Sequence, residues 1–218
     1  YSNSATSCCK IRIIKNLLII NMKNTLLIIL TLLITACGLF ETREPEEPES
    51  GNVSFIPPSS ASIVVSNFIN AFNEKNTENY TACFADTTLG DSRPFRFIPS
   101  SEAEARWSGF FANWSVENER RYFFSMTTKL SVDVAPEITL SNSRFDIMTP
   151  DSAVFTSNYY VKISHSLTTA PTDFQGYMQL TILPKINGLW AIQRWEDISN
   201  DKDSIKSSFS TLKAIFSN

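Results

Sequence analysis

The cysteine with the clearest chemical context is Cys37, which follows a long apolar segment. A basic start at Met22-Lys23 precedes an apolar run from Leu26 to Leu33, and Ile34-Thr35-Ala36-Cys37 follows that run. A cationic start, an apolar stretch too short to span a bilayer and small residues at the cleavage point are features of a secretory signal. We therefore expect the thiol of Cys37 to be acylated, for example by palmitate, and to become the mature N-terminus.

Acylation of Cys37 would place the protein in a membrane of the bacterial cell envelope. Two or three acyl chains, at about 0.8 kcal/mol per buried CH₂, hold a protein firmly on a bilayer. Gly38 follows the cysteine and no Asp stands there, which favours the outer membrane in a host with two membranes. The alternative is a retained transmembrane anchor over residues 13–39, which the Lys23-Asn24 pair in mid-span disfavours.

The chain divides by composition into five segments. We expect residues 1–21, which lack an initiator Met, to be an upstream extension, and residues 22–36 to be the signal peptide. Residues 37–60 are rich in Glu and Pro, which indicates an extended tether. Residues 61–200 are expected to form one folded domain, and residues 201–218 a C-terminal amphipathic helix or tail.

The charge of the chain argues against a nucleic-acid-binding protein, and its cysteine content argues against an intramolecular disulfide. Residues 1–36 hold four basic residues and no acidic one, so the mature chain carries 15 basic and 22 acidic residues and a net charge of −7. Such a surface does not favour nucleic acid as a partner. Once Cys37 is acylated, Cys83 is the single thiol of the mature chain, so no intramolecular disulfide is expected.

The sequence contains few residues that could form a metal or cofactor site. One histidine cannot supply a two-histidine metal site, and six dispersed glycines form no phosphate-binding loop. No G-x-S-x-G nucleophile motif is present either. We expect no metal and no cofactor.

Apolar periodicity predicts helices in the first half of the domain and strands in the second. Helical spacing predicts helices over residues 61–72, 77–84 and 101–114, the last with Ser101 as its cap, and from Ser115 to Met126. Alternating patterns predict strands over residues 129–134, 138–148, 153–165, 174–183 and 189–195, and Asn187-Gly188 predicts a type I′ hairpin turn. A closing helix is expected through Ile205, Phe209, Leu212 and Phe216.

Helices followed by a strand meander indicate an α+β fold with the helices packed on one face of an antiparallel sheet. The segment from Ala71-Phe72-Asn73 to Tyr80-Thr81-Ala82-Cys83-Phe84 resembles the opening helices of NTF2-like domains, also called SnoaL-like or cystatin-like cone domains. Asn187-Gly188-Leu189-Trp190 with Trp195-Glu196-Asp197 is similar to their last hairpin and strand. The resemblance covers residues 60–200 and implies a curved sheet, but it does not specify an activity.

Enzymes of this family use acids and bases inside the cone, which makes His165 with Asp197, Asp173 or Asp146 the candidate catalytic group. His165 would act as a general base that a carboxylate orients. The alternative places His165 at the polar, half-solvated end of its strand, and Glu196-Asp197 at a strand end in solvent. We favour this second interpretation and expect no catalytic residue.

Aromatic residues offer a second candidate site. In a cone of this family they could line a concave pocket for an apolar ligand, or they could fill the interior as core, which is the more common role. We expect most of them to be core. The residues concerned are Trp107, Phe111, Tyr159, Trp190 and Trp195.

The sequence therefore favours a membrane-anchored envelope lipoprotein whose NTF2-like domain is a non-enzymatic binding module for a small apolar ligand or an envelope protein. The alternative is an NTF2-like envelope enzyme of the lyase, isomerase or hydrolase type with His165 as its base. A third possibility is a structural module that forms a homodimer through the open face of the sheet.

Overall fold

The computed structural model describes residues 55–131, 134–199 and 207–217 of the chain. All described residues belong to one compact unit, Asn52–Asn218. The signal segment, Cys37 and most of the expected tether lie outside the described residues, so acylation of Cys37 stays a prediction. Within the described residues, no helix has the length and apolar character needed to cross a membrane.

This unit has the predicted α+β fold and is built on one open sheet, but the sheet is mixed rather than antiparallel throughout as expected. The sheet order is β1-β5-β4-β3-β2, in which β1 pairs parallel with β5 and the other neighbours pair antiparallel. The strands are β1 (Arg96–Ile98), β2 (Glu137–Thr149), β3 (Ser152–Lys162), β4 (Asp173–Pro184) and β5 (Trp190–Ile198).

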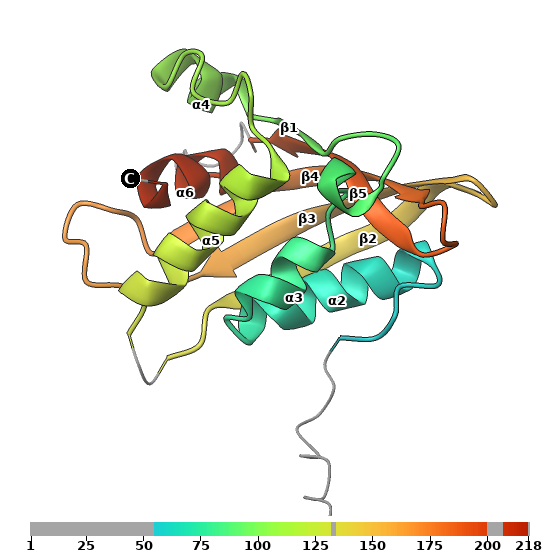
Figure 1. Cartoon of the computed structure of the whole chain (residues 1–218). Coiled ribbons are helices and arrows are strands. Elements are labelled where there is room, and N and C mark those ends of the chain that lie inside the picture. The colour runs from blue at the N-terminus through green and yellow to red at the C-terminus, as the bar shows by residue number, and fades with distance from the viewer. Residues whose placement is uncertain (1–54, 132–133, 200–206, 218) are drawn as a thin grey trace, which may run out of the picture. The chain divides into compact units, whose positions relative to one another are not determined.

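Four helices lie on the same side of the sheet, whose other face they leave uncovered (Figure 1). They cover the alternate side chains of β3, β4 and β5 that point inward. Examples are Phe155, Leu180 and Trp195, which lie side by side on neighbouring strands. These helices are α2 (Ala61–Asn73), α3 (Thr77–Ala82), α5 (Val116–Lys129) and α6 (Phe209–Phe216).

Side-chain caps explain where the predicted helices begin. The Ser60 hydroxyl accepts the N–H of Ile63 at the start of α2, and Asn76 accepts the N–H of Asn79 in the same way at α3. At Ser115 the cap is held by Asn118 Oδ1, which accepts both the Ser115 N–H and its hydroxyl. The sequence predictions of α2, α3 and α5 are confirmed.

The prediction of one helix over residues 101–114 is wrong. Helix α4 (Ser101–Arg106) has Ser100 rather than Ser101 as its N-cap, and it ends before Gly109, whose φ of 74° is left-handed. The chain then turns. The four aromatic residues whose helical spacing led to the prediction therefore do not form one buried stripe; they are Trp107, Phe110, Phe111 and Trp114. Phe111 and Trp114 are buried, Trp107 is half-buried and Phe110 is 38% exposed.

Two further local predictions need correction. No strand begins at residue 129, because Lys129 still belongs to α5 and Leu130 forms only an isolated bridge with His165. The hairpin between β4 and β5 is present, but of its two turn residues only Gly188 has positive φ. Lys185 donates its N–H to the carbonyl of Leu189, which makes a three-residue loop rather than a type I′ turn.

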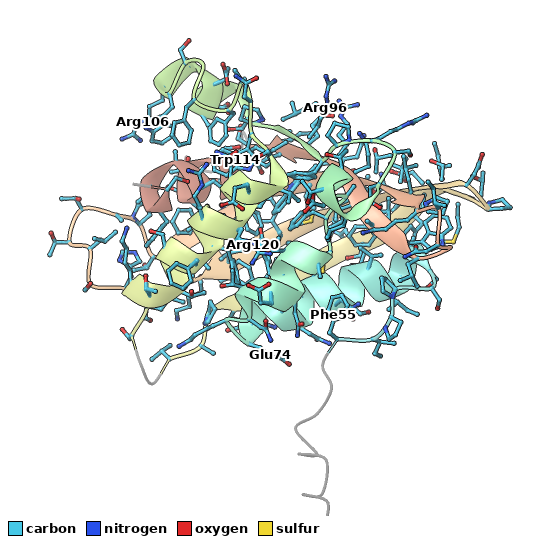
Figure 2. All side chains as sticks on the ribbon, in the orientation of Figure 1. Phe55, Glu74, Arg96, Arg106, Trp114 and Arg120 are labelled. Carbon is cyan, nitrogen blue, oxygen red and sulfur yellow. The ribbon has the colours of Figure 1, made fainter. Side chains whose placement is uncertain are left out.

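Aromatic side chains fill the space between the helices and the sheet. Trp195 packs edge-on against Phe68 from α2, Phe97 from β1 and Phe209 from α6, with ring centroids 5.4, 5.6 and 4.7 Å away. Charged side chains such as Glu74 and Arg106 lie at the periphery (Figure 2). The Cys83 thiol is buried in the same core, where burial raises its pKa.

Candidate functional site

Helix α6 lies inside the fold rather than on its surface. Every residue from Ser208 to Ala214 is buried, although several of them are polar. A helix that is buried on all sides must find partners for its polar side chains within the protein. Among the described residues, Lys213 and Ser210 each belong to a polar cluster in the interior.

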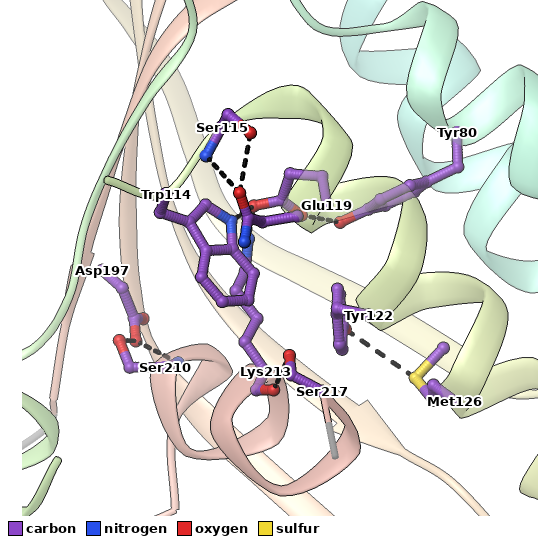
Figure 3. Close-up of polar contacts among 11 residues, drawn as sticks. Tyr80, Trp114, Ser115, Glu119, Tyr122, Met126, Asp197, Ser210, Lys213 and Ser217 are labelled. Carbon is purple, nitrogen blue, oxygen red and sulfur yellow. Dashed lines mark hydrogen bonds and ion pairs between the residues drawn. The ribbon is translucent and has the colours of Figure 1, made fainter. Parts of the chain in front are cut away.

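The first cluster is an ion pair between Lys213 of α6 and Glu119 of α5, neither of which is exposed at all. The Glu119 carboxylate accepts two further hydrogen bonds, from the Tyr80 hydroxyl at 3.0 Å and from Trp114 Nε1 at 2.7 Å. Figure 3 shows these groups converging from separate elements on the carboxylate. The buried charge of Glu119 thus has three donors, which is the condition under which such a pair is tolerated.

Aromatic rings surround the ammonium group of Lys213. Its Nζ lies 3.9 Å from the ring centroids of both Phe97 and Trp195, within the range of cation–π attraction. Tyr122 and Trp114 are farther, at 5.5 and 5.7 Å. We call this set the Lys213 cage, and its residues are Phe97, Trp114, Glu119, Tyr122 and Trp195.

Burial dominates the acid–base properties of this cluster. It lowers the pKa of Lys213 from 10.5 to about 8, although the charge of Glu119 acts in the opposite direction. Burial, followed by the charge of Glu119, raises the pKa of Tyr80 and of Tyr122 well above its usual value of 10.0. Both tyrosines therefore stay neutral hydrogen-bond donors at physiological pH.

The second cluster centres on Asp197, which is 1% exposed rather than at a solvated strand end as expected. Strand β5 continues to Ile198 beneath α6, and this continuation buries the carboxylate. Asp197 accepts the Tyr159 hydroxyl at 2.5 Å, the Ser210 N–H at 2.7 Å and the Ser210 hydroxyl. The Tyr159 oxygen in turn accepts the N–H of Phe209 at 2.9 Å. The Asp197 carboxylate thus accepts three hydrogen bonds, two of which come from Ser210 and hold the start of α6.

A glycine on β4 makes room for Tyr159. Gly176 is the neighbour of Tyr159 in the β3–β4 ladder, and a Cβ at this position would come within 2.5 Å of the Tyr159 oxygen and 2.7 Å of the Ile198 carbonyl. No larger residue fits here while the hydroxyl keeps its bond to Asp197.

His165 lies just beyond β3 and is half-buried against Phe216, with ring centroids 5.3 Å apart. Its Nδ1 accepts the N–H of Leu167 at 3.2 Å, so the proton resides on Nε2, which is 2.8 Å from the Pro171 carbonyl. Both ring nitrogens are therefore used by the main chain of the following loop. Nothing in this arrangement presents a free lone pair to a substrate.

The other two carboxylates considered with His165 lie elsewhere. Asp146 on β2 binds Arg144 and accepts the Thr156 hydroxyl at 3.0 Å, and Asp173 on β4 accepts the hydroxyls of Tyr160 and Thr172. None of the hydrogen bonds of His165 in the described residues involves a carboxylate. The described residues also contain no group of three or more His, Cys, Asp or Glu side chains that could hold a metal.

The aromatic residues proposed as pocket lining take several positions. Phe111, Tyr159 and Trp195 are buried in the core, whereas Trp107 and Trp190 are half-buried. The main hollows of the described residues have other linings, such as a surface hollow of about 440 Å³ beside the Lys185–Asp91 ion pair. The five aromatic residues therefore do not share an open cavity.

Comparisons with known proteins were made by sequence and by structure. No family model and no curated protein matches the sequence. Solved structures do match the fold. A protein from Streptomyces avermitilis is 9% identical, with a TM-score of 0.47 over 66% of this chain and 95% of that one. An NTF2-like protein from Cytophaga hutchinsonii is 13% identical, with a TM-score of 0.44 over 63% of this chain and 93% of that one.

A ketosteroid isomerase-like protein from Erwinia carotovora atroseptica is 12% identical, with a TM-score of 0.44 over 67% of this chain and 96% of that one. Several of the structural neighbours are described as NTF2-like or ketosteroid isomerase-like proteins. These neighbours belong to the family that the helices and the last hairpin resembled. At these identities and TM-scores the likeness to NTF2-like proteins carries no argument about activity.

Sequence reasoning missed the Lys213–Glu119 pair. A signal for it was nevertheless present, because residues 209–216 contain one charged residue in an otherwise apolar or small helix. A helix that is apolar on all faces is expected to be buried, and its single Lys must then have a buried acidic partner. The identity of that partner could not be read from the sequence, since α5 contains both Glu117 and Glu119 and acidic residues also occur in other elements.

Proposed function

We propose that the chain is a lipid-anchored protein of the bacterial envelope, and that its folded part is a non-enzymatic binding module for another protein. The anchor rests on the sequence pattern that ends at Cys37. The assignment as a binding module rests on one observation: α6 occupies the inner side of the sheet, where a substrate or an apolar ligand would otherwise lie.

The two buried carboxylates of the interior support this assignment because neighbouring side chains already bind them. Glu119 binds Lys213, Tyr80 and Trp114, and Asp197 binds Tyr159 and Ser210. Acid–base catalysis needs a group that can reach the proton of a substrate, and small-ligand binding needs a concave space. His165 does not supply the former, since its two nitrogens are held by the main chain.

A fluorescent apolar probe tests the filled interior. N-phenyl-1-naphthylamine should gain no saturable fluorescence with the native protein, but it should do so when urea or acid loosens the core. A stoichiometric gain with the native protein would contradict the proposal and favour a small apolar ligand. His165→Ala should leave partner binding unchanged.

The uncovered face of the sheet is the surface on which to test for a protein partner. Gln179 on β4 lies on this face and is half-buried, whereas Arg121 on α5 is exposed on the helical side. A photo-crosslinking residue at each position, in cells, would give an adduct with an envelope protein or with a second copy of the chain. An adduct from Gln179 alone supports the sheet face, and no adduct from either position contradicts the binding-module proposal.

A further inference from the structure

The walls of the Lys213 cage do not belong to the helix that carries Lys213. Trp195 comes from β5, Phe97 from β1, and Glu119 and Tyr122 from α5. Trp114 lies in the turn before α5. Helix α6 therefore supplies only the occupant, and the rest of the fold builds the site.

The carboxylate of the cage is held in place by groups other than Lys213. Tyr80 and Trp114 each donate a hydrogen bond to Glu119, from α3 and from the turn before α5. The ring of Tyr80 is itself stacked on Phe123 with centroids 3.9 Å apart. Removal of the lysine side chain would therefore leave the carboxylate oriented toward the space that the ammonium group occupied.

The aromatic walls are likewise fixed by contacts among themselves. Phe97 packs against Trp114 and Trp195 with centroid distances of 6.1 and 5.6 Å. The indole N–H of Trp195 has no hydrogen-bond partner among the described residues, although the side chain is fully buried. Two ring faces at cation–π distance and one fixed carboxylate are the groups that recognise an organic ammonium ion.

We propose that the Lys213 cage is an ammonium-binding site of this fold, which α6 occupies in cis, and that it accepts a primary alkylammonium ion when the Lys213 side chain is absent. The ligand class follows from the space. Replacing Lys213 by Ala keeps Cβ and deletes the remaining three carbons and the ammonium group, which together correspond to n-propylammonium.

The experiment uses the full chain with Lys213→Ala, purified in detergent and titrated at pH 7 with n-propylammonium chloride. The ligand is protonated at this pH, as a lysine amine is. We expect a saturable rise of the thermal midpoint, with a Kd on the order of 1 mM because a ligand with four non-hydrogen atoms makes few contacts. Wild-type protein should show no such rise, because Lys213 already fills the site.

Matched ligands and variants separate ammonium recognition from simple filling of a hole. At equal ionic strength, 1-propanol should give at most about a tenth of the effect and propionate none, since Glu119 repels an anion. Glu119→Gln in the Lys213→Ala background should weaken the response to propylammonium about tenfold or more. Lys213→Met, whose side chain fills the cage without a charge, should not respond.

The test also works where Lys213→Ala is unfolded in buffer. A ligand that binds only the folded state draws the folding equilibrium toward that state, so the recovered folded fraction becomes the readout. Recovery by propylammonium but not by propanol supports the proposal. Equal effects of the two ligands, the absence of any saturable effect, or a response that is independent of Glu119 would overturn it and leave a purely structural ion pair.

Discussion

Asp197 Oδ2 accepts the main-chain N–H of Ser210 at 2.7 Å, so a side chain of β5 caps the first turn of α6. The first N–H groups of a helix have no partner within the helix, and a carboxylate there also interacts favourably with the helix dipole. The same carboxylate binds the Tyr159 hydroxyl on β3. One residue thus joins three elements of the interior.

Loss of this carboxylate should destabilise the fold. Asp197→Ala leaves the Tyr159 hydroxyl and the Ser210 N–H buried without their acceptor, and we expect a loss of about 3 kcal/mol in the free energy of unfolding. Urea denaturation followed by tryptophan fluorescence measures it. Asp173→Ala, which removes a carboxylate near the surface, serves as the control and should cost less than about 1 kcal/mol. Equal losses for the two variants would contradict the assigned role.

The Glu119–Lys213 pair should show strong coupling. Glu119→Ala leaves the buried ammonium of Lys213 without its counter-ion, and we expect a loss of about 3–5 kcal/mol. Adding Lys213→Met removes that charge, so the double variant should be more stable than Glu119→Ala alone. A double-mutant cycle from urea denaturation gives the coupling energy. A coupling near zero would mean that the pair is not buried in solution.

The pH dependence of stability should reveal the lowered pKa of Lys213. Burial lowers that pKa to about 8 in the folded protein, whereas an ordinary lysine titrates at 10.5. Between these values the unfolded chain binds a proton that the folded protein does not, so this contribution to stability rises with pH from about 8 to about 10.5 and is constant below about 8.

Other buried groups act in the opposite sense at higher pH. Burial raises the pKa of Cys83 and of Tyr159, so the unfolded chain loses protons above about pH 9 and 10 that the folded protein keeps, and stability falls. The informative quantity is therefore the difference between wild type and Lys213→Met, measured by urea unfolding from pH 7 to 9.5. Above pH 8 the free energy of unfolding of wild type should rise relative to that of Lys213→Met. Parallel pH dependences of the two proteins would refute the prediction.

Two adjacent phenylalanines provide a matched test of the turn after α4. Phe111 is 3% exposed and Phe110 is 38% exposed. Phe111→Ala should cost about 3–5 kcal/mol because it opens a cavity beside Phe97, whereas Phe110→Ala should cost about 1 kcal/mol or less. Thermal and urea unfolding of both variants measure the difference. If Phe110→Ala lowered the free energy of unfolding as much as Phe111→Ala, a continuous helix through residue 114 would be the better description.

The lipid anchor has a direct test. Cys37→Ala should leave an unprocessed and unlipidated precursor, because the acylated thiol is the group that the signal pattern presents. Labelling with a palmitate analogue and fractionation of membranes measure lipidation and location, and Cys83→Ala is the control that should behave as wild type. Normal maturation of Cys37→Ala, with unchanged partition into membranes, would show that the pattern at Ile34-Thr35-Ala36-Cys37 is not an acylation signal.

Elements with a regular apolar pattern and a clear cap could be predicted from the sequence. Helix α2 and strand β4 agree with the periods of 3.6 and 2 in their side chains, since both bury one face against the core. The helix over residues 101–114 failed because Gly109 adopts a left-handed conformation that the spacing of the aromatic residues did not reveal. The spacing of four aromatic residues alone cannot distinguish a helix that buries all four from a turn that buries two of them.

The interior site was beyond such patterns because its parts lie far apart in the sequence. Glu119 and Lys213 are 94 residues apart, and only the packing of α6 against α5 brings them together. Asp197 could be placed at the end of β5, but its burial depends on α6 crossing above it. The sequence therefore indicated the fold class and left open what fills its interior.

The position of α6 also determines when the fold can be completed during synthesis. Phe209 packs on Tyr159 and Trp195, and strand β1 pairs with a segment of β5 that is made much later. Contacts between such distant segments form slowly, because a long loop must close before any of them stabilises the chain. Until residues 209–216 leave the ribosome, the core lacks its last component. The chain should therefore emerge from the ribosome without a stable tertiary structure, which is compatible with the export that we propose for it.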